Sequence, residues 1–420
     1  MTEPTSPIQI ADFRLLWLAR FAQVLATTGM VVIIGYQLYD TARSDYGMSI
    51  GQAAFQLGLL GLAQFLPFLA LSPIAGVLAD RFDRRHVGAI ATAIDMGIAF
   101  ALAWITATGR VTLPLLFLLA ACHGAARVMA SPSLASIAPK LVPAPLMPRA
   151  IALSSIAWQS GSLLGPAMAG LLYAASPDRP YWASLALLGV SFVSVLLIRR
   201  LPPPEGSREV HPFRQITDGF RYVWNERFLL GCVTLDLFAV LLGGATALLP
   251  VFARDILMVG PEGLGIMRAA PGAGAAVVAL WLSWRPLQKN VGVKMLLGVA
   301  AYGAATIGFG LSNHFVLSLA MLAALGAADM VSVFVRTSLV QINTPDEMRG
   351  RVSSISSLAV SASNELGEMQ SGIAAALLGA KGAVLFGGAG AILITVLWAI
   401  IFPELKNART FAPQYREPRS

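Results

Sequence analysis

Long apolar runs recur along the whole chain, and they constrain its fold more than any other feature. We count twelve segments of roughly 20 or more predominantly apolar residues, the length that a helix needs to cross about 30 Å of hydrocarbon. Hydrophobic residues make up 56% of the 420 positions and charged residues only 12%, which excludes an ordinary soluble domain. Because a chain in hydrocarbon must satisfy its backbone hydrogen bonds internally, each run is expected to be helical. The sequence therefore predicts an all-α polytopic membrane protein with twelve transmembrane helices.

The predicted spans fall into two sets of six with a polar segment between them. They cover residues 14–38, 51–78, 86–108, 112–138, 149–175 and 181–199, and then 228–252, 262–284, 292–312, 315–341, 351–378 and 382–402. The predicted organisation is a six-helix bundle over 1–199, a linker over 200–227, a second six-helix bundle over 228–402 and a tail over 403–420. The linker starts with a proline triplet and continues with apolar residues three or four apart. This pattern predicts either a short helix on the cytoplasmic membrane surface or a solvated connector that caps the bundle.

The basic residues predict an orientation. Most of the 30 Lys and Arg residues fall in loops on the side that holds both termini, and such an excess marks the cytoplasmic side. We therefore expect both termini in the cytoplasm, with the chain in a bacterial cytoplasmic (inner) membrane. The net charge of +8 then reflects topology, and no nucleic-acid partner is expected.

No pattern in the chain predicts a metal or cofactor site. Cys122 and Cys232 both lie in predicted helices, and the four histidines are scattered. His123 is the histidine inside a span, where a hydrogen-bonded structural role is expected. Asp95, in the middle of the third span, is expected to pair with a local partner.

The chain also contains an internal repeat. When the sequence is shifted by 202 residues, several landmarks coincide, in register with the fourth and fifth spans over the tenth and eleventh. The coinciding residues are 124–127 with 326–329, Pro143 with Pro345, Arg149 with Arg351, Gly165 with Gly367, and Gly170 with Gly372. Such symmetry is typical of transporters built from two parallel halves.

Residues 76–85, GVLADRFDRR, place five charges in ten positions between two apolar runs. Such a segment cannot remain in hydrocarbon, so a tight polar turn is expected. Its position after the second of twelve helices resembles the loop signature of the major facilitator superfamily. The resemblance implies that the motif latches the cytoplasmic ends of the two halves in one conformation. The gating residues that it implies are Gly76, Asp80, Arg81, Arg84 and Arg85.

Two further patterns resemble branches of that superfamily. In the fifth span, Gly161, Gly165, Pro166 and Gly170 resemble a motif that marks drug and metabolite exporters, although the same spacing serves ordinary close helix packing. The stretches 236–257 and 345–352 resemble the branch that contains the enterobactin exporter and macrolide efflux pumps. This resemblance implies efflux without specifying the substrate.

Charged residues inside spans are candidates for coupling or substrate contact, because each costs about 2.5–3.5 kcal/mol at the bilayer centre. The candidates are Arg20, Asp95, Arg127, Asp236, Arg268, Asp329, Arg336, Glu365 and Glu368. Counted from the cytoplasmic ends of their helices, Arg127 and Asp329 lie at similar depths in the membrane, and so do Arg20 and Asp236. We therefore expect that Arg127 pairs with Asp329 and Arg20 with Asp236 across the two halves. The alternative is that each charge is bound to a neighbouring helix in its own half. Arg336 is close enough to a helix end to extend to the surface.

Glu365 and Glu368 share a helix face at positions i and i+3. Two carboxylates close together in low dielectric resist ionising together, so one is expected to hold a proton, while a nearby Arg268 would oppose this. The alternative is structural hydrogen bonding with Asn364 and Gln370.

The combined prediction is a secondary active transporter, an antiporter that exports a small siderophore-like or drug-like amphipathic molecule in exchange for protons by alternating access. The alternative is an uptake carrier or facilitator of the same fold. An enzyme is not expected, because the sequence contains neither a Walker loop nor a His-Glu-x-x-His motif. The expected partners are the substrate, protons and the lipid bilayer, with the protein acting as a monomer.

Overall fold

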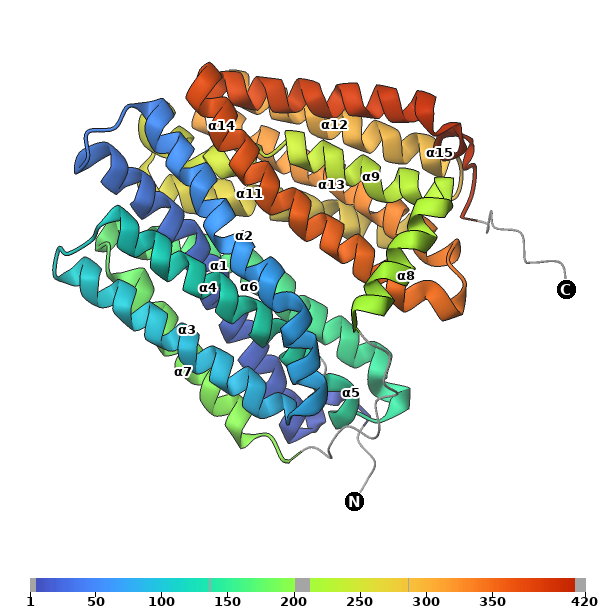
Figure 1. The fold of residues 1–420 in the computed structure, drawn as a ribbon, viewed down its shortest axis with the longest axis horizontal. Helices are drawn as coiled ribbons and strands as arrows, with labels where there is room; N and C mark the ends of the chain where they lie inside the picture. The colour runs from blue at the N-terminus through green and yellow to red at the C-terminus, as the bar shows by residue number, and fades with distance from the viewer. Residues whose placement is uncertain (1–4, 136, 201–211, 286, 412–420) are drawn as a thin grey trace, which may run out of the picture. The chain divides into compact units, whose positions relative to one another are not determined.

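The computed structural model describes residues 5–135, 137–200, 212–285 and 287–411. Within helices, the side chains at 68, 73, 75–81, 131–132, 135, 139, 212–216 and 346 are also outside the description. Throughout the described ranges, the regular elements are helices (Figure 1). The chain is thus all-α, as predicted.

The first half contains six long helices with short elements between them. They are α1 (Ala11–Ser44), α2 (Ile50–Arg81), α3 (Arg84–Ala107), α4 (Leu113–Ala135), α6 (Met147–Ala175) and α7 (Arg179–Leu197), with η1 (Pro7–Gln9), α5 (Ala138–Leu141) and η2 (Ala144–Leu146). Each of the first six predicted spans overlaps one of the long helices.

The second half begins with α8, Pro212–Asn225, the short helix predicted in the linker. The helices that follow are α9 (Arg227–Leu242), η3 (Ala245–Leu248), α10 (Leu249–Val251), η4 (Phe252–Ile256), α11 (Gly260–Trp284), α12 (Val291–Leu311), α13 (Phe315–Ile342), α14 (Asp346–Ile401) and α15 (Pro403–Asn407). Ten helices in the described ranges are long and apolar enough to cross a membrane.

Two predicted spans differ from single straight helices for local reasons. The span predicted over 228–252 is α9 only as far as Leu242, after which Gly243 and Gly244 interrupt the helix and the π-helical turn η4 follows. In α14 the backbone of Gly379 is non-helical, with φ 75° and ψ 162°. Because φ in this range favours glycine, the chain bends there, and α14 holds the two helical segments predicted as separate spans.

The contacts divide the chain into two units. Unit 1 contains Met1–Gly47, Leu62–Glu209 and Val259–Ala269, and unit 2 contains Met48–Gly61, Val210–Met258 and Ala270–Ser420. Each unit therefore includes the first turns of one helix from the other half of the sequence: the start of α11 belongs to unit 1, and the start of α2 belongs to unit 2.

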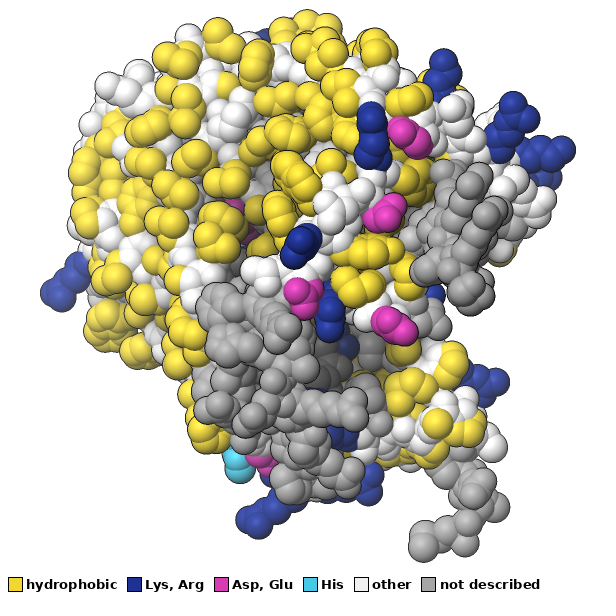
Figure 2. Space-filling model, turned by 45° about the vertical axis from the view of Figure 1, so that its right-hand side comes forward, with side chains coloured by type: hydrophobic (Ala, Val, Ile, Leu, Met, Phe, Trp, Pro, Cys, Tyr) yellow, Lys and Arg dark blue, Asp and Glu magenta, His cyan; other side chains and the backbone are white. Residues whose placement is uncertain are grey.

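Apolar side chains fill the interior of each unit and also cover its outside. In unit 1, Phe13 and Leu16 of α1 pack with Leu134, Val195 and Ile198 in one buried cluster. Figure 2 shows a broad area of hydrophobic side chains with few charges within it. Many of the exposed side chains are large and apolar, among them Leu197 at 64% and Leu377 at 78% exposed. Such surfaces are expected of helices whose solvent is lipid rather than water.

Glycines matched by the shift of 202 make equivalent close contacts. A Cβ added to Gly124 of α4 would lie 2.6 Å from the carbonyl oxygen of Gln64 on α2, and one added to Gly326 of α13 would collide with the carbonyl of Pro271 on α11. In both halves a helix therefore approaches its neighbour's backbone so closely that no side chain fits. The repeat seen in the sequence extends to this packing.

The second matched pair packs on the beginning of another helix. In unit 1, Gly170 of α6 lies against Pro261 and Gly265 of α11. In unit 2, Gly372 of α14 lies against α2, where an added Cβ would be 2.6 Å from the Cα of Gly58. The two glycines thus hold the starts of α11 and α2, the two helices shared between units.

Candidate functional site

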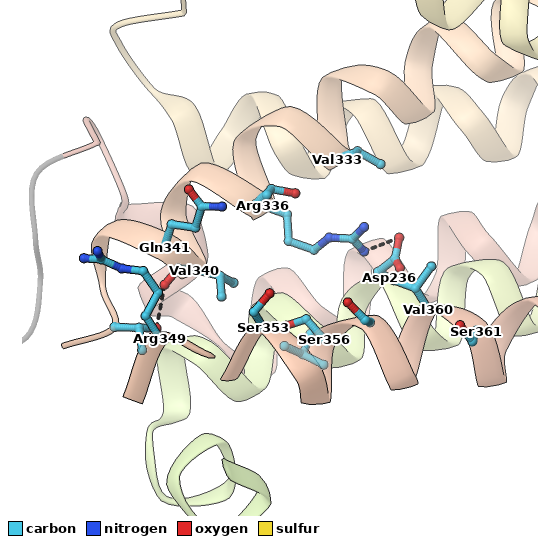
Figure 3. A pocket seen from close by; sticks show the side chains of 14 residues that line it. Asp236, Val333, Arg336, Val340, Gln341, Arg349, Ser353, Ser356, Val360 and Ser361 are labelled. Atoms are coloured by element: carbon cyan, nitrogen blue, oxygen red, sulfur yellow. Dashed lines mark hydrogen bonds and ion pairs between the residues drawn. The ribbon is translucent and has the colours of Figure 1, made fainter. Parts of the chain in front are cut away.

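A cavity of about 430 Å³ lies in unit 2 between α9, α13 and α14 (Figure 3). Valines, hydroxyl-bearing residues and charged residues all reach it. Its lining is Val233, Asp236, Val333, Arg336, Thr337, Val340, Gln341, Thr344, Arg349, Ser353, Ser356, Ser357, Val360 and Ser361. The combination of apolar walls with a few placed polar groups is typical of small-molecule sites.

An ion pair between Asp236 of α9 and Arg336 of α13 forms one wall of this cavity (Figure 3). Both side chains are largely buried, at 9% and 11% exposed. Each charge compensates the other where water is scarce, so the pair can remain charged inside the protein.

Both partners of this ion pair lie in the second half of the sequence. Arg336 occupies the position beside Asp236 in this structure, and pairing of Arg20 with Asp236 across the halves stays a prediction. Arg336 is close enough to the end of α13 to extend to the surface, but here the carboxylate of Asp236 holds its guanidinium inside the helix bundle.

The sequence predictions missed the hydroxyl groups of the cavity. Ser353, Ser356, Ser357 and Ser361 of α14 stand at positions i, i+3, i+4 and i+8, so they share one helix face. The Oγ of Ser356 is buried without a hydrogen-bond partner in the described ranges and is therefore available to a ligand. The serine-rich run 353–363 is the signal in the sequence that marks these residues.

A second cavity, of about 460 Å³, lies in unit 1 beside α1 and α6. It is lined by Arg20, Ala138, Met147, Ile151, Ser154, Ser155, Trp158 and Gln159. Every one of these residues except Arg20 falls on a residue of the unit 2 cavity when the numbering is shifted by 202. The two cavities therefore occupy equivalent positions in the two repeats.

The chemistry of the two cavities differs. Both keep the serine pair, as Ser154 and Ser155 in unit 1 and as Ser356 and Ser357 in unit 2. Where unit 2 has Arg349 and Ser353, unit 1 has the apolar Met147 and Ile151. Arg20 lines the unit 1 cavity, and its role in coupling or substrate contact stays a prediction.

Arg127 and Asp329, the other hypothesised pair, lie on α4 and α13. Arg127 has no hydrogen bond or ion pair among the residues that the structure describes. Asp329 is within electrostatic range of Tyr302, whose hydroxyl donates to the carbonyl oxygen of Gly243 over 2.9 Å. Pairing of Arg127 with Asp329 stays a prediction.

The predicted carboxylates on α14 are partly buried, and Glu365, Glu368 and Arg268 all have interaction partners. A Cβ added to Gly61 of α2 would be 3.0 Å from Oε2 of Glu368, so this carboxylate lies directly against bare helix backbone. The Oε1 of nearby Gln370 is buried without a partner in the described part of the chain. The proton-binding role of the two glutamates stays a prediction.

The gating loop is described in part. The side chains of Gly76, Asp80 and Arg81 are outside the described residues, and Arg84 has interaction partners. Arg85 is 7% exposed; it donates to the carboxylate of Asp83 at 3.2–3.4 Å and to the carbonyl oxygen of Ile198. Arg85 is thus anchored inside unit 1 in this conformation.

Asp83 also caps α3, because its Oδ1 accepts the backbone N–H of Arg85 over 3.0 Å. Partial burial acts to raise the pKa of Asp83, but the hydrogen bonds and charge of Arg85 and the charge of His86 outweigh it, so the pKa lies below the ordinary value. The polar turn predicted from the sequence is therefore held in shape by a charged cap.

The exporter-like motif in α6 makes close contacts along its whole length. A Cβ on Gly161 would be 2.9 Å from Cγ1 of Val24, and one on Gly165 would be 2.6 Å from the carbonyl oxygen of Leu25, both on α1. The carbonyl oxygen of Pro166 faces α11, where a Cβ on Gly265 would be 2.7 Å away. The motif therefore packs closely against α1 and α11, and its link to export stays a prediction.

The branch-like stretch 345–352 meets the linker helix. Arg351 of α14 forms an ion pair with Asp218 of α8 over 3.3 Å, and Gly219 packs on the backbone of Arg351. On the same helix, Phe220 and Trp224 stack with ring centroids 5.6 Å apart and are 54% and 61% exposed. The helix α8 is therefore docked on α14 with an aromatic pair exposed.

Asp95 and His123 pair with each other, as the separate predictions of a local partner and a structural hydrogen bond allowed. Oδ1 of Asp95 lies 2.6 Å from Nδ1 of His123. Among the described residues, no group of three or more His, Cys, Asp or Glu side chains could hold a metal ion.

The fold is that of the major facilitator superfamily, a class of polytopic membrane transporters. The structure of the nucleoside transporter NupG is similar with a TM-score of 0.75 at 15% identity, over 93% of this chain and 99% of that one. The structure of a D-xylose–proton symporter is similar with a TM-score of 0.69 at 15% identity, over 95% of this chain and 98% of that one.

Within this class, the chain belongs to the transmembrane secretion effector family, whose model matches residues 2–418. It is 28% identical over 411 residues to proteins named enterobactin exporter EntS from Escherichia coli K12 and from Shigella boydii serotype 18, which covers 96% of this chain and 94% of each relative. The protein is therefore a membrane transporter, not an enzyme.

Proposed function

We propose that the protein exports a small amphipathic molecule, siderophore-like or drug-like, from the cytoplasm in exchange for protons. It acts as a monomer in a bacterial inner membrane with both termini in the cytoplasm. Near full-length similarity to relatives named enterobactin exporters supports export.

The unit 2 cavity is the observation that carries this proposal. Its valines offer apolar contact, while the ion pair of Asp236 with Arg336 and the face of serines offer hydrogen bonds. A molecule with both an apolar body and polar groups matches such a lining better than a fully apolar or a highly charged one does. The unpartnered Oγ of Ser356 is a polar contact that a ligand would complete.

Glu365 and Glu368 are proposed to carry the coupling proton. A carboxylate against the bare backbone of Gly61 is neutral when protonated and negative when not. Its protonation state therefore changes how favourably α14 packs on the start of α2. A proton that binds from one side of the membrane and leaves to the other side can therefore shift the packing of α14 on α2 during the transport cycle.

The glycine contacts at the starts of α2 and α11 are proposed to open and close in each cycle. Both helices follow loops predicted to lie on the outer side of the membrane. Contacts of backbone on backbone, as at Gly170 and Gly372, can separate without leaving large cavities, because no side chain interlocks there. In the other conformation the motif with Asp80, Arg84 and Arg85 would latch the cytoplasmic ends.

Transport into everted membrane vesicles tests this proposal. Such vesicles present the cytoplasmic side outward, so an exporter accumulates substrate when the lumen is acidic. Enterobactin and an amphipathic dye are suitable first probes. We expect accumulation that collapses when the pH gradient is dissipated and that is lost in a Glu365→Gln, Glu368→Gln variant.

The controls separate direction from coupling. Glu262→Gln changes a carboxylate near the start of α11 that is not a proposed proton carrier, and it should transport normally. Accumulation only in right-side-out vesicles would instead establish the uptake alternative. Accumulation that ignores the pH gradient would refute proton coupling while leaving export intact.

A further inference from the structure

A buried acid–histidine pair joins α3 and α4 in unit 1, and its two residues line neither of the cavities described above. Asp95 is 2% exposed and His123 is 0% exposed. The 2.6 Å separation between Oδ1 of Asp95 and Nδ1 of His123 is short for a hydrogen bond between nitrogen and oxygen. Neither residue has a part in the transport scheme proposed above.

The geometry determines which nitrogen is available. When Asp95 is ionised its carboxylate can only accept, so Nδ1 then carries the hydrogen and donates it to Asp95. The second nitrogen, Nε2, is buried and has no hydrogen-bond partner among the described residues. In the neutral imidazole, Nε2 therefore carries the lone pair, which is where a proton binds.

The surroundings leave few other charges to determine the state of this pair. Between their first and last turns, α2 and α7 carry no charged side chain, and α3 carries Asp95 alone. The other titratable or charged groups on the helices around the pair are Arg127 and Cys122 on α4, Asp12, Arg14, Arg20, Tyr36, Tyr39, Asp40 and Arg43 on α1, and Tyr181 on α7. The hydroxyl of Tyr181 already donates to Gln37 over 2.6 Å.

Arg127 is close enough to His123 for their charges to interact. The two residues are four apart on α4, so they lie on the same face about one turn from each other. Arg127 is partly exposed and has no ion-pair partner in the described ranges. A second positive charge one turn away would therefore repel it.

We propose that Asp95 and His123 form a buried proton-binding site that is separate from Glu365 and Glu368. A proton from water binds the Nε2 lone pair and forms an N–H bond, and Asp95 remains the fixed counter-charge. The protonated pair is neutral as a whole, whereas the unprotonated pair is a net negative charge. Loading the site therefore removes a net negative charge about one turn from Arg127, so proton binding acts on one of the intramembrane charges of the first half.

Nitrogen NMR on the full-length protein in nanodiscs tests this proposal directly and needs no substrate. The other histidines, His86, His211 and His314, are replaced by Gln so that ¹⁵N-labelled His123 gives the only histidine signals. Between about pH 5 and pH 9, the range in which histidines titrate, we expect Nδ1 to stay protonated while Nε2 gains a proton as the pH falls.

Two variants check the assigned partners. Asp95→Asn keeps the shape but removes the counter-charge, and it should weaken proton binding at Nε2 by about tenfold or more. Arg127→Gln removes the repelling charge and should strengthen it. Asp178→Asn, a loop acid outside the pair, is the matched control and should change nothing.

The titration and its variants include results that would contradict the proposed proton-binding site. The proposal is overturned if Nε2 shows no change across the pH range, or if Asp95→Asn and Asp178→Asn give the same titration. If Asp95→Asn fails to fold, the titration of the otherwise native pair and the Arg127→Gln shift still decide the outcome. None of these results depends on which molecule is transported or in which direction.

Discussion

Substitution of Gly372 by alanine is the sharpest test of the proposed transport cycle. An added Cβ would lie 2.6 Å from the Cα of Gly58 and 3.0 Å from the carbonyl oxygen of Ala54, both backbone atoms of α2. Real Cβ atoms essentially never come within 3.0 Å of another heavy atom and ordinarily keep 3.4 Å or more. The helices α14 and α2 must therefore separate by about 0.4–0.8 Å, because no side chain can rotate away.

Overpacking of this kind costs about 1–3 kcal/mol. If the contact exists in only one conformation, this cost lowers the population of that conformation by about 5–150-fold. Gly97 provides the matched control, because it lies in α3, and an added Cβ would have no heavy atom within 4 Å. Gly97→Ala should be neutral, or stabilising by up to about 1 kcal/mol through higher helix propensity.

Cysteine labelling reads out this population. Ala54 is 0% exposed, so a single cysteine at this position, with Cys122 and Cys232 replaced by Ala, should react slowly with a membrane-impermeant maleimide. We expect Gly372→Ala to increase the labelling rate and to slow transport. Equal labelling and transport in Gly372→Ala and Gly97→Ala would refute the role given to this contact.

Three further predictions concern ion pairs and caps. Asp236→Asn should destabilise the protein by about 3 kcal/mol because it leaves the Arg336 charge buried and unpaired, and adding Arg336→Met should recover much of that loss; additive losses in denaturant titrations would contradict the pairing. Asp83→Ala should cost about 1 kcal/mol through loss of the α3 cap. The pKa of Asp83 in the folded protein lies below its ordinary value of about 3.9. The stabilisation that ionised Asp83 gives to the folded state is therefore complete above about pH 3.9 and is lost as the pH falls through the lowered pKa. The thermal unfolding temperatures of wild type and Asp83→Ala should accordingly converge in acid. Asp218→Asn should change stability by less than about 1 kcal/mol, since the pair with Arg351 is partly exposed, but it should make α8 more sensitive to protease; unchanged digestion would show that packing alone holds α8.

Most of the fold was predictable because one physical requirement dominates it. Each run of about 20 apolar residues has to be a helix in lipid, and the charged turns between runs mark where helices end. The exceptions occur where glycine permits a break that hydropathy does not register. Gly243 and Gly244 end α9 inside an apolar run, and Gly379 bends α14 without a polar interruption.

The site was predictable only in part, because depth along a helix does not determine direction around it. Asp236 was identified from its charge, but its partner depends on which face of α13 meets α9, which the sequence alone does not specify. Arg336 lies within about two turns of the end of α13, so its depth suggested that it could reach the surface. Hydroxyl groups such as Ser356 carry no charge signal and were missed for that reason.

The correspondence of the two cavities has a consequence for how such a protein can diversify. If an ancestral six-helix subunit once worked beside an identical copy, any change to its pocket would have appeared twice. Fusion of the copies into one gene removes that restriction, so one pocket can hold an indole, Trp158, while its counterpart holds Val360. Substrate selectivity can then be altered through one pocket at a time. Met147 and Arg349 occupy equivalent positions, so Met147→Arg or Arg349→Met is a direct way to engineer that selectivity.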